Sequence, residues 1–127
     1  MKHIHLLLAI ATAFIATGNA TAQKKDSIEV HTLLAKAKQG NSDAQNTLGT
    51  YFYLGKKVKQ NYEVALKWFS LAAKQKHVKA IANMGLCYQK GHGIAQDSLM
   101  AVKLYKESVK AGNAQLVKQR EENVAKN

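Results

Sequence analysis

The sequence predicts an all-α protein in which short helix-turn-helix repeats stack side by side as an α-solenoid. Residues 43–76 align with residues 79–112 at a constant offset of 36 residues, and the paired residues keep their chemical type. A repeat of this length is typical of stacked supersecondary units. Apolar residues also recur at helical spacing, the chain contains no proline, and no segment alternates as a strand would.

The pairs that define the repeat are small, apolar or aromatic residues. They are Ala44 with Ala80, Leu48 with Met84, Gly49 with Gly85, Phe52 with Tyr88, Gly55 with Gly91, Ala65 with Ala101, and Phe69 with Tyr105. Because stacked two-helix units present extended surfaces, the repeat favours a binding function over a catalytic one.

The first 22 residues have the pattern of a secretory signal peptide. A short basic start with Lys2 precedes an apolar run that ends at Ile15, and Ala20-Thr21-Ala22 is an A-x-A cleavage site. A membrane anchor is the alternative, but the apolar run is shorter than the roughly 20 residues that a spanning helix needs. We expect cleavage after Ala22, a periplasmic or secreted chain, one domain at residues 23–127, and no integral membrane segment after cleavage.

Six helices are expected along the rest of the chain. Asn61 and Asp97 precede helical segments and have side chains that cap helix N-termini. Glycines at 40, 55, 91 and 112 interrupt the helical pattern, as glycines at helix C-termini do. The expected helices are 26–39, 43–54, 62–75, 79–90, 97–111 and about 114–124.

These helices group into two complete repeats, residues 41–76 and 77–112, flanked by half-repeat helices at 26–39 and 113–124. Leu33 lies 36 residues before Phe69, so the first helix corresponds to the second half of a preceding repeat. Gly112-Asn113-Ala114 matches Gly40-Asn41-Ser42, so the last helix corresponds to the first half of a following repeat. Two hairpins bury little surface by themselves, and we expect both flanking helices to act as caps.

Particular residues indicate how the repeats pack. Gly49 and Gly85 lie inside expected helices, where each costs about 1 kcal/mol relative to alanine. Their recurrence predicts close approach of the partner helix, which a side chain would block. Trp68 is expected to be the largest core residue. Cys87, the single cysteine, is expected to be a buried apolar residue, with a reactive thiol as the alternative.

The repeated residues resemble the Sel-1-like repeat, a relative of the tetratricopeptide repeat, over about residues 41–113. The first repeat supplies Ala44, Leu48, Gly49, Phe52, Gly55, Val58, Ala65, Trp68, Phe69, Ala72 and Ala73. The second supplies Ala80, Met84, Gly85, Tyr88, Gly91, Gly93, Ile94, Asp97, Ala101 and Tyr105. The departures from the family pattern are Lys57 at the second turn glycine, Leu104 at the tryptophan, and Ser108-Val109 at the paired alanines.

The resemblance implies a right-handed α-solenoid that acts as an adaptor. Family members assemble or regulate other proteins, among them exported and envelope-associated bacterial proteins. Some cysteine-rich secreted relatives carry paired cysteines and are linked to β-lactam binding or hydrolysis. This chain has Cys87 alone, so neither the disulfides nor that activity is carried over. The departures at Leu104 and Ser108-Val109 imply that their helix meets a different neighbour, as expected near an end.

No catalytic, cofactor or metal site is predicted, and the chain is interpreted as a non-enzyme. Gly49 to Lys56 has one residue too many between its glycines for a phosphate loop, and Lys57 stands where Ser or Thr is required. The histidines at 31, 77 and 92 form no i, i+4 pair typical of zinc ligation. Those at 77 and 92 are expected to be solvated in turns.

A candidate partner groove follows from the first helix of each repeat. If Ala44, Leu48 and Phe52 face inward, a different set lies on the opposite face, and the resemblance implies that this face lines the concave side. The candidate groove residues are Asn46, Thr50, Tyr53 and Leu54 of the first repeat and Asn83, Leu86, Gln89 and Lys90 of the second. Such a surface could hold an extended or helical peptide. The alternative is that these positions pack against the end helices.

Charge sets the alternatives for function. The formal net charge is +11, nearly all of it lysine, with Arg120 as the one arginine. Nucleic acid is not an expected partner, because lysine lacks the bidentate base contacts of arginine and the chain is expected outside the cytoplasm. The first hypothesis is a protein–protein adaptor with an unknown protein partner. The second is a binder of anionic lipid or glycan on an envelope or host surface. The third is a β-lactamase-like hydrolase.

Overall fold

The computed structural model describes residues 2–126, with side chains described for residues 20–126. Within that range it contains the helices α1 (Lys2–Lys38), α2 (Ser42–Leu54), α3 (Tyr62–Lys74), α4 (Val78–Lys90) and α5 (Ser98–Ala125). No strand occurs in the described part of the chain, so the all-α prediction is confirmed. The observed bounds of α2, α3 and α4 agree with the predicted bounds to within one residue.

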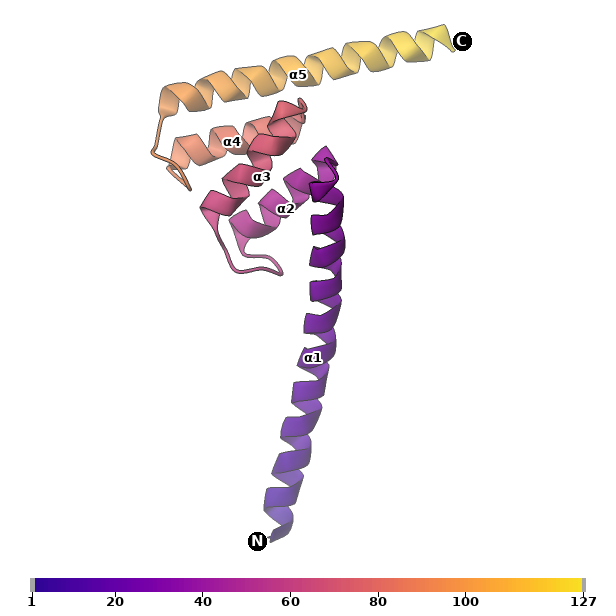
Figure 1. Cartoon of the computed structure of the whole chain (residues 1–127), viewed down its shortest axis with the longest axis vertical. Helices are drawn as coiled ribbons and strands as arrows, with labels where there is room; N and C mark the ends of the chain where they lie inside the picture. The colour runs from indigo at the N-terminus through magenta and orange to yellow at the C-terminus, as the bar shows by residue number, and fades with distance from the viewer. Residues whose placement is uncertain (1, 127) are drawn as a thin grey trace.

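Two helical hairpins form the body of the molecule. α2 packs with α3, α4 packs with α5, and α3 contacts α4, so the hairpins stack in chain order (Figure 1). α1 packs against α2, and α1 and α5 both extend beyond the stack (Figure 1). The arrangement is the predicted solenoid of helix-turn-helix units.

Repeat residues form the core where the two hairpins meet. Ala65 and Phe69 of α3 and Cys87 of α4 make one buried cluster. Leu66 and Met84 are half-buried and pack against it. The cluster joins the second helix of the first repeat to the first helix of the second repeat, so stacking buries apolar surface that a single hairpin would expose.

α1 acts as the predicted N-terminal cap of the stack. Ala37 of α1 is buried together with Ala44 and Leu48 of α2, and Leu33 and Leu34 pack against them. The first helix therefore covers the apolar face that α2 would otherwise expose.

Gly49 and Gly85 lie where the two helices of a hairpin approach each other closely, as the sequence predicted. A Cβ atom at Gly49 would lie 2.6 Å from the ring of Phe69, and one at Gly85 would lie 2.9 Å from the ring of Tyr105. In each case the ring comes from the second helix of the same hairpin. The absence of a side chain lets the two helices approach, and the prediction is confirmed.

Trp68 is half-buried, so the prediction that it is the largest core residue is wrong. Phe69, with 2% of its surface exposed, is the largest fully buried side chain. Successive helical residues point about 100° apart, so only one of the two aromatic residues can face the hairpin interior. Phe69 occupies the space beside Gly49, and Trp68 turns toward the cluster shared with α1.

Side chains at matching repeat positions cap the helices. Nδ1 of His77 accepts a hydrogen bond from the backbone N–H of Ala80 at 3.2 Å, as Asn41 does in the first repeat. Nε2 of His77 also lies 2.7 Å from a carboxylate oxygen of Asp43, and only 13% of the His77 side chain is exposed. The expectation that His77 is solvated is therefore wrong. Asn61 and Asp97 cap α3 and α5 as predicted.

The predicted break at Gly112-Asn113 is wrong, because α5 continues from Ser98 to Ala125. No separate sixth helix is therefore present in the described part of the chain. A third unit would place Arg120 at the core position of Leu48 and Glu121 at the helical glycine position. A helix that turned back at Gly112 would bury both charges without partners, which is unfavourable. Residues 113–126 instead remain exposed to solvent.

The predicted signal peptide forms the first part of α1, and its side chains up to residue 19 lie outside the described ones. Among the described residues, no helix has both the length and the apolar character that crossing a membrane requires. Further along α1, the carboxylate of Glu29 accepts hydrogen bonds from the Tyr51 hydroxyl at 2.7 Å and from Nζ of Lys57. The hydrogen bond from Lys57 holds the pKa of Glu29 below its ordinary value. These contacts tie α1 to the first repeat.

Candidate partner groove

A hollow of about 180 Å³ lies between α2 and α4, on the surface predicted to bind a partner. Its lining consists of Thr50, Tyr53 and Leu54 of α2, Asn83 and Leu86 of α4, and the buried Phe69 of α3. Five of the eight candidate residues therefore lie together around one hollow. They come from both repeats, so the hollow depends on how the two hairpins stack.

A pair of asparagines links the two repeats beside this hollow. Nδ2 of Asn83 donates a hydrogen bond to Oδ1 of Asn46 at 3.0 Å. The hydroxyl of Thr50 donates to the backbone oxygen of Asn46 at 3.0 Å. An asparagine amide has two donors and one acceptor oxygen, so the pair keeps hydrogen-bonding capacity for the backbone of a partner.

Tyr53 forms a wall of the groove, but its polar end is already engaged. Its hydroxyl lies 2.9 Å from Nδ1 of His92, in the turn between α4 and α5. The Tyr53 ring lies 5.1 Å from the ring of Tyr62, and Tyr62 stacks on His92 with ring centroids 4.1 Å apart. Burial raises the pKa of Tyr53, which keeps its hydroxyl protonated. This aromatic cluster holds the second turn against the first hairpin.

Gln89 and Lys90 lie away from the hollow. The side-chain oxygen of Gln89 accepts a hydrogen bond from the Tyr105 hydroxyl of α5 at 2.7 Å. Tyr105 belongs to the second helix of the same repeat, so this hydrogen bond holds the Gln89 side chain within its own hairpin. Lys90 is exposed at the end of α4.

Sequence reasoning did not assign Phe69, Tyr62 or His92 to the groove. Phe69 was assigned to the core only, and His92 was expected to be solvated, whereas it is half-buried in the aromatic cluster. Tyr53 and His92 lie 39 positions apart, slightly more than one repeat. Since α2 and α4 stack in register, that spacing could have placed the second turn next to the end of α2.

The Cys87 thiol lies close to the groove but is shielded from solvent. Cys87 is fully buried under Phe69, and burial raises its pKa to about 11. The interpretation of Cys87 as a small buried apolar residue is therefore favoured over a reactive thiol. Among the described residues, no group of three or more His, Cys, Asp or Glu side chains could hold a metal ion.

The sequence model of the Sel1 repeat matches residues 42–77 and 78–113. These matches cover more than half of the chain and lie within one residue of the predicted repeat bounds. The chain belongs to the Sel1 repeat family. Sel1 repeats generally mediate protein–protein interaction on a scaffold fold.

Two curated Sel1 relatives are much longer than this chain. Protein sel-1 homolog 2 of Rattus norvegicus is 41% identical over 70 residues, which cover 54% of this chain and 10% of that protein. DAP3-binding cell death enhancer 1 of Rattus norvegicus is 34% identical over 84 residues, which cover 66% of this chain and 16% of that protein. The chain thus spans between a tenth and a sixth of their lengths.

Solved structures share the Sel1 fold with this chain. c5321, a protective antigen of uropathogenic Escherichia coli with an SLR fold, matches with a TM-score of 0.63 and 32% identity over 65% of this chain and 18% of that chain. A Sel1 repeat protein from Oxalobacter formigenes matches with a TM-score of 0.55 and 40% identity over 57% of this chain and 29% of that chain. Helicobacter pylori cysteine rich protein B matches with a TM-score of 0.62 at 20% identity, covering 65% and 62% of the two chains, which supports the fold only.

Proposed function

We propose that this chain is an exported, non-catalytic adaptor that binds a protein partner through the groove between α2 and α4. The family generally mediates protein–protein interaction, and one relative, DAP3-binding cell death enhancer 1, is named for a protein that it binds. The observation that carries the proposal is the hollow lined by both repeats. Such a surface exists only in the stacked solenoid.

The size and lining of the groove favour a peptide segment over a small molecule. The hollow measures about 180 Å³, below the roughly 300–1,000 Å³ of typical small-molecule sites. It is large enough to anchor an apolar side chain of a partner. Leu54, 61% exposed, extends the apolar surface, and the Asn46–Asn83 pair can bind backbone groups. An extended or helical peptide with one apolar anchor fits these features.

The test compares variants in and outside the groove. The purified chain is used as bait in an envelope extract, and the recovered partner is then titrated against Leu86→Asp and Leu54→Asp. We expect each groove variant to weaken binding at least about tenfold, because a charge enters an apolar contact. Leu71→Asp, at a position 42% exposed on α3, is the matched control and should bind like the wild type. Equal affinity for all variants would rule out the groove.

Tyr53→Ala is a weaker probe of the same groove. Removing Tyr53 also takes away the hydroxyl group beside Nδ1 of His92 and the ring that packs against Tyr62. A loss of binding would then have two causes, the lost contact between Tyr53 and the partner and the movement of the turn that contains His92. Circular dichroism on every variant separates these effects.

Export is the second part of the proposal. The basic start, short apolar run and Ala20-Thr21-Ala22 site support it. Expression with the native leader should place the protein outside the cytoplasm, and N-terminal sequencing should begin at Gln23. Retention of Met1 in a cytoplasmic fraction would contradict export.

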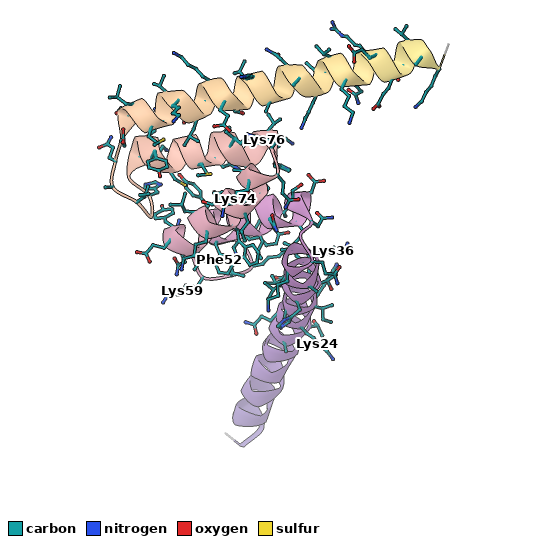
Figure 2. All side chains as sticks on the ribbon, turned by 45° about the horizontal axis from the view of Figure 1, so that its top comes forward. Lys24, Lys36, Phe52, Lys59, Lys74 and Lys76 are labelled. Atoms are coloured by element: carbon teal, nitrogen blue, oxygen red, sulfur yellow. The ribbon has the colours of Figure 1, made fainter. Side chains whose placement is uncertain are left out.

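The lysine surface supports an alternative function in binding anionic lipid or glycan. Lys24, Lys36, Lys59 and Lys74 project from α1, the α2–α3 turn and α3, so positive charge is spread over the molecule (Figure 2). Sedimentation with anionic vesicles at low and high salt tests this function, because added salt screens exposed charges. Vesicle binding that salt abolishes and Leu86→Asp leaves unchanged would favour it over the groove.

A β-lactamase-like hydrolase is the third hypothesis. The likeness to cysteine rich protein B concerns the fold only, and Cys87 is the single cysteine of this chain. Turnover of a chromogenic β-lactam by the purified chain would support hydrolysis and contradict the adaptor proposal.

A further inference from the structure

The outer side of α5 carries an open apolar surface, which we call the end face and define as Val102, Tyr105, Lys106 and Val109. These residues line a shallow hollow of about 430 Å³. Val102 is 50% exposed and Val109 is 64% exposed, so each apolar side chain presents half or more of its surface to solvent. α5 lies along one edge of the helical body, and none of the described elements lies on its outer side (Figure 1).

The end face corresponds to a surface that is covered in the first repeat. The residues 36 positions earlier are Leu66, Phe69, Ser70 and Ala73 of α3. Leu66 and Phe69 pack in one cluster with Met84 and Cys87 of α4. The end face is thus the continuation of the interface by which one repeat receives the first helix of the next.

Within residues 2–126, which the structure describes, no helix occupies that position. The segment after Gly112 continues α5 into solvent, and the core positions of a third unit hold Arg120 and Glu121. The same face also departs from the family pattern, since Val109 replaces the second of the paired alanines. A larger and more exposed apolar side chain stands where the first repeat has Ala73.

Charge indicates which kind of helix fits the end face. Lys106 stands at the position of Ser70, and Lys103 and Lys110 lie within one helical turn of it. The nearby acid Glu107 pairs with Lys76 at 3.3 Å, on the side of α5 toward the α3–α4 turn. A second copy docked through the same face would bring together two sets of the lysines at 103, 106 and 110, in a chain of net charge +11. A helix with carboxylates is the complementary occupant.

We propose that the end face binds an acidic amphipathic helix of a partner protein. The partner helix presents two apolar side chains three residues apart, as Met84 and Cys87 of α4 do toward α3. It also presents a carboxylate opposite Lys106. This surface is separate from the groove between α2 and α4, so the chain has two docking sites.

The test uses two N-capped helical peptides that share the apolar residues of α4. They differ only at the polar positions, which are glutamates in one peptide and lysines in the other. Fluorescence anisotropy should show at least tenfold tighter binding of the glutamate peptide. Val109→Asp should weaken its binding at least tenfold. Lys106→Glu should reverse the preference between the two peptides.

Two controls separate the end face from the groove and from general charge. Leu86→Asp changes the groove and should leave peptide affinity within twofold of the wild type. Lys59→Glu changes charge on the turn between α2 and α3, away from α5 (Figure 2), and should also have no more than a twofold effect. A loss of partner binding by Leu86→Asp with intact peptide binding would support the end face independently of the groove.

Several outcomes would overturn the end-face proposal. One is that neither peptide binds, and another is that Val109→Asp binds the glutamate peptide as the wild type does. A concentration-dependent dimer that Val109→Asp abolishes would assign the face to a second copy. Binding to anionic vesicles that Val109→Asp abolishes, without peptide binding, would assign it to a membrane surface.

Discussion

At the scale of single residues, each hairpin depends on a glycine opposite an aromatic ring. At Gly49 an added Cβ would lie 2.6 Å from two ring atoms of Phe69 and 3.2 Å from the backbone oxygen of Ala65. At Gly85 the nearest contacts are all ring atoms of Tyr105, beginning at 2.9 Å. Phe69 is 2% exposed and has no room to move, whereas Tyr105 is half-buried. The two repeats therefore tolerate a methyl group to different degrees.

Gly49→Ala should destabilise the protein by about 1–2 kcal/mol, because overpacking outweighs the gain in helix propensity. Gly85→Ala should cost less than about 1 kcal/mol, since the Tyr105 ring can turn toward solvent. Urea unfolding followed by circular dichroism measures both. Equal effects, or no effect at Gly49, would show that the ring contact does not limit helix approach.

The turns show how one repeat position accepts two different residues. Gly93 has a φ of 78°, and a Cβ there would lie 2.6 Å from the backbone oxygen of Tyr62. Lys57 occupies the same position in the first repeat with a φ of 62°. Its side chain instead reaches Asp26 of α1 at 3.4 Å, and Asp26 lies 36 positions before Tyr62. The lysine is tolerated because α1 leaves space where α3 presents its backbone.

Cys87 should react slowly in the folded protein. Burial raises its pKa from 9.0 to about 11, so at pH 8 the neutral thiol dominates and the thiolate fraction is about 100-fold lower than in the unfolded chain. Alkylation by iodoacetamide at pH 8 should therefore proceed at least about 100-fold faster in urea than in buffer. Native labelling at the unfolded rate would show that the thiol is accessible.

At the scale of elements, periodicity and turn chemistry predicted the bounds of α2, α3 and α4, but they predicted a helix end at Gly112 that the structure does not have. Gly40 and Gly112 occupy the same repeat position, yet Gly40 ends α1 with a φ of 93° and Gly112 lies inside α5. The residues that follow make the difference. Ala44 and Leu48 gain burial when the chain turns, whereas Arg120 and Glu121 would lose their hydration.

Removing residues 114–127 should leave the free energy of unfolding within about 0.5 kcal/mol of the full chain, because residues 113–126 are exposed. The helical circular dichroism signal per molecule should fall as this part of α5 is lost. Thermal and urea unfolding measure the effect. A loss above about 2 kcal/mol would show that the extension stabilises the body.

At the scale of the whole molecule, the two ends of the solenoid are treated differently. α1 covers the apolar face of α2 through a buried cluster, while the outer face of α5 stays open. Among the described helices, only α1 caps the stack. A repeat interface that is closed at one end and available at the other is consistent with a protein that docks against another macromolecule.

The chain that begins at Gln23 should keep the fold. The residues of α1 that pack on the body run from Val30 to Ala37, and Asp26 and Glu29 also lie after the cleavage site. We expect its melting temperature to lie within about 2 °C of the full chain. Removal of all of α1 should lower the free energy of unfolding by at least about 2 kcal/mol, because it exposes the apolar face that contains Leu48 and Phe52. A shorter chain from Gln23 that unfolds readily would contradict this division.

Part of the candidate groove could be predicted from the sequence. The helical period placed Thr50, Tyr53 and Leu54 on one face of α2, and the repeat offset placed Leu86 beside them on α4. The period could not show that Gln89 turns to Tyr105, nor that His92 folds back onto Tyr53. Those contacts depend on the angle between helices and on the path of a turn, which repeat spacing leaves open.

The amino-acid sequence by itself determined the helical class, the 36-residue unit and the close approach at the glycines, because these follow from local propensity and from which side chains recur. Only the tertiary structure decided which aromatic ring fills the core, where α5 ends, and which surfaces remain open. Those outcomes depend on whether each side chain packs against another residue or stays hydrated. Such a choice between burial and hydration is made by the stack as a whole.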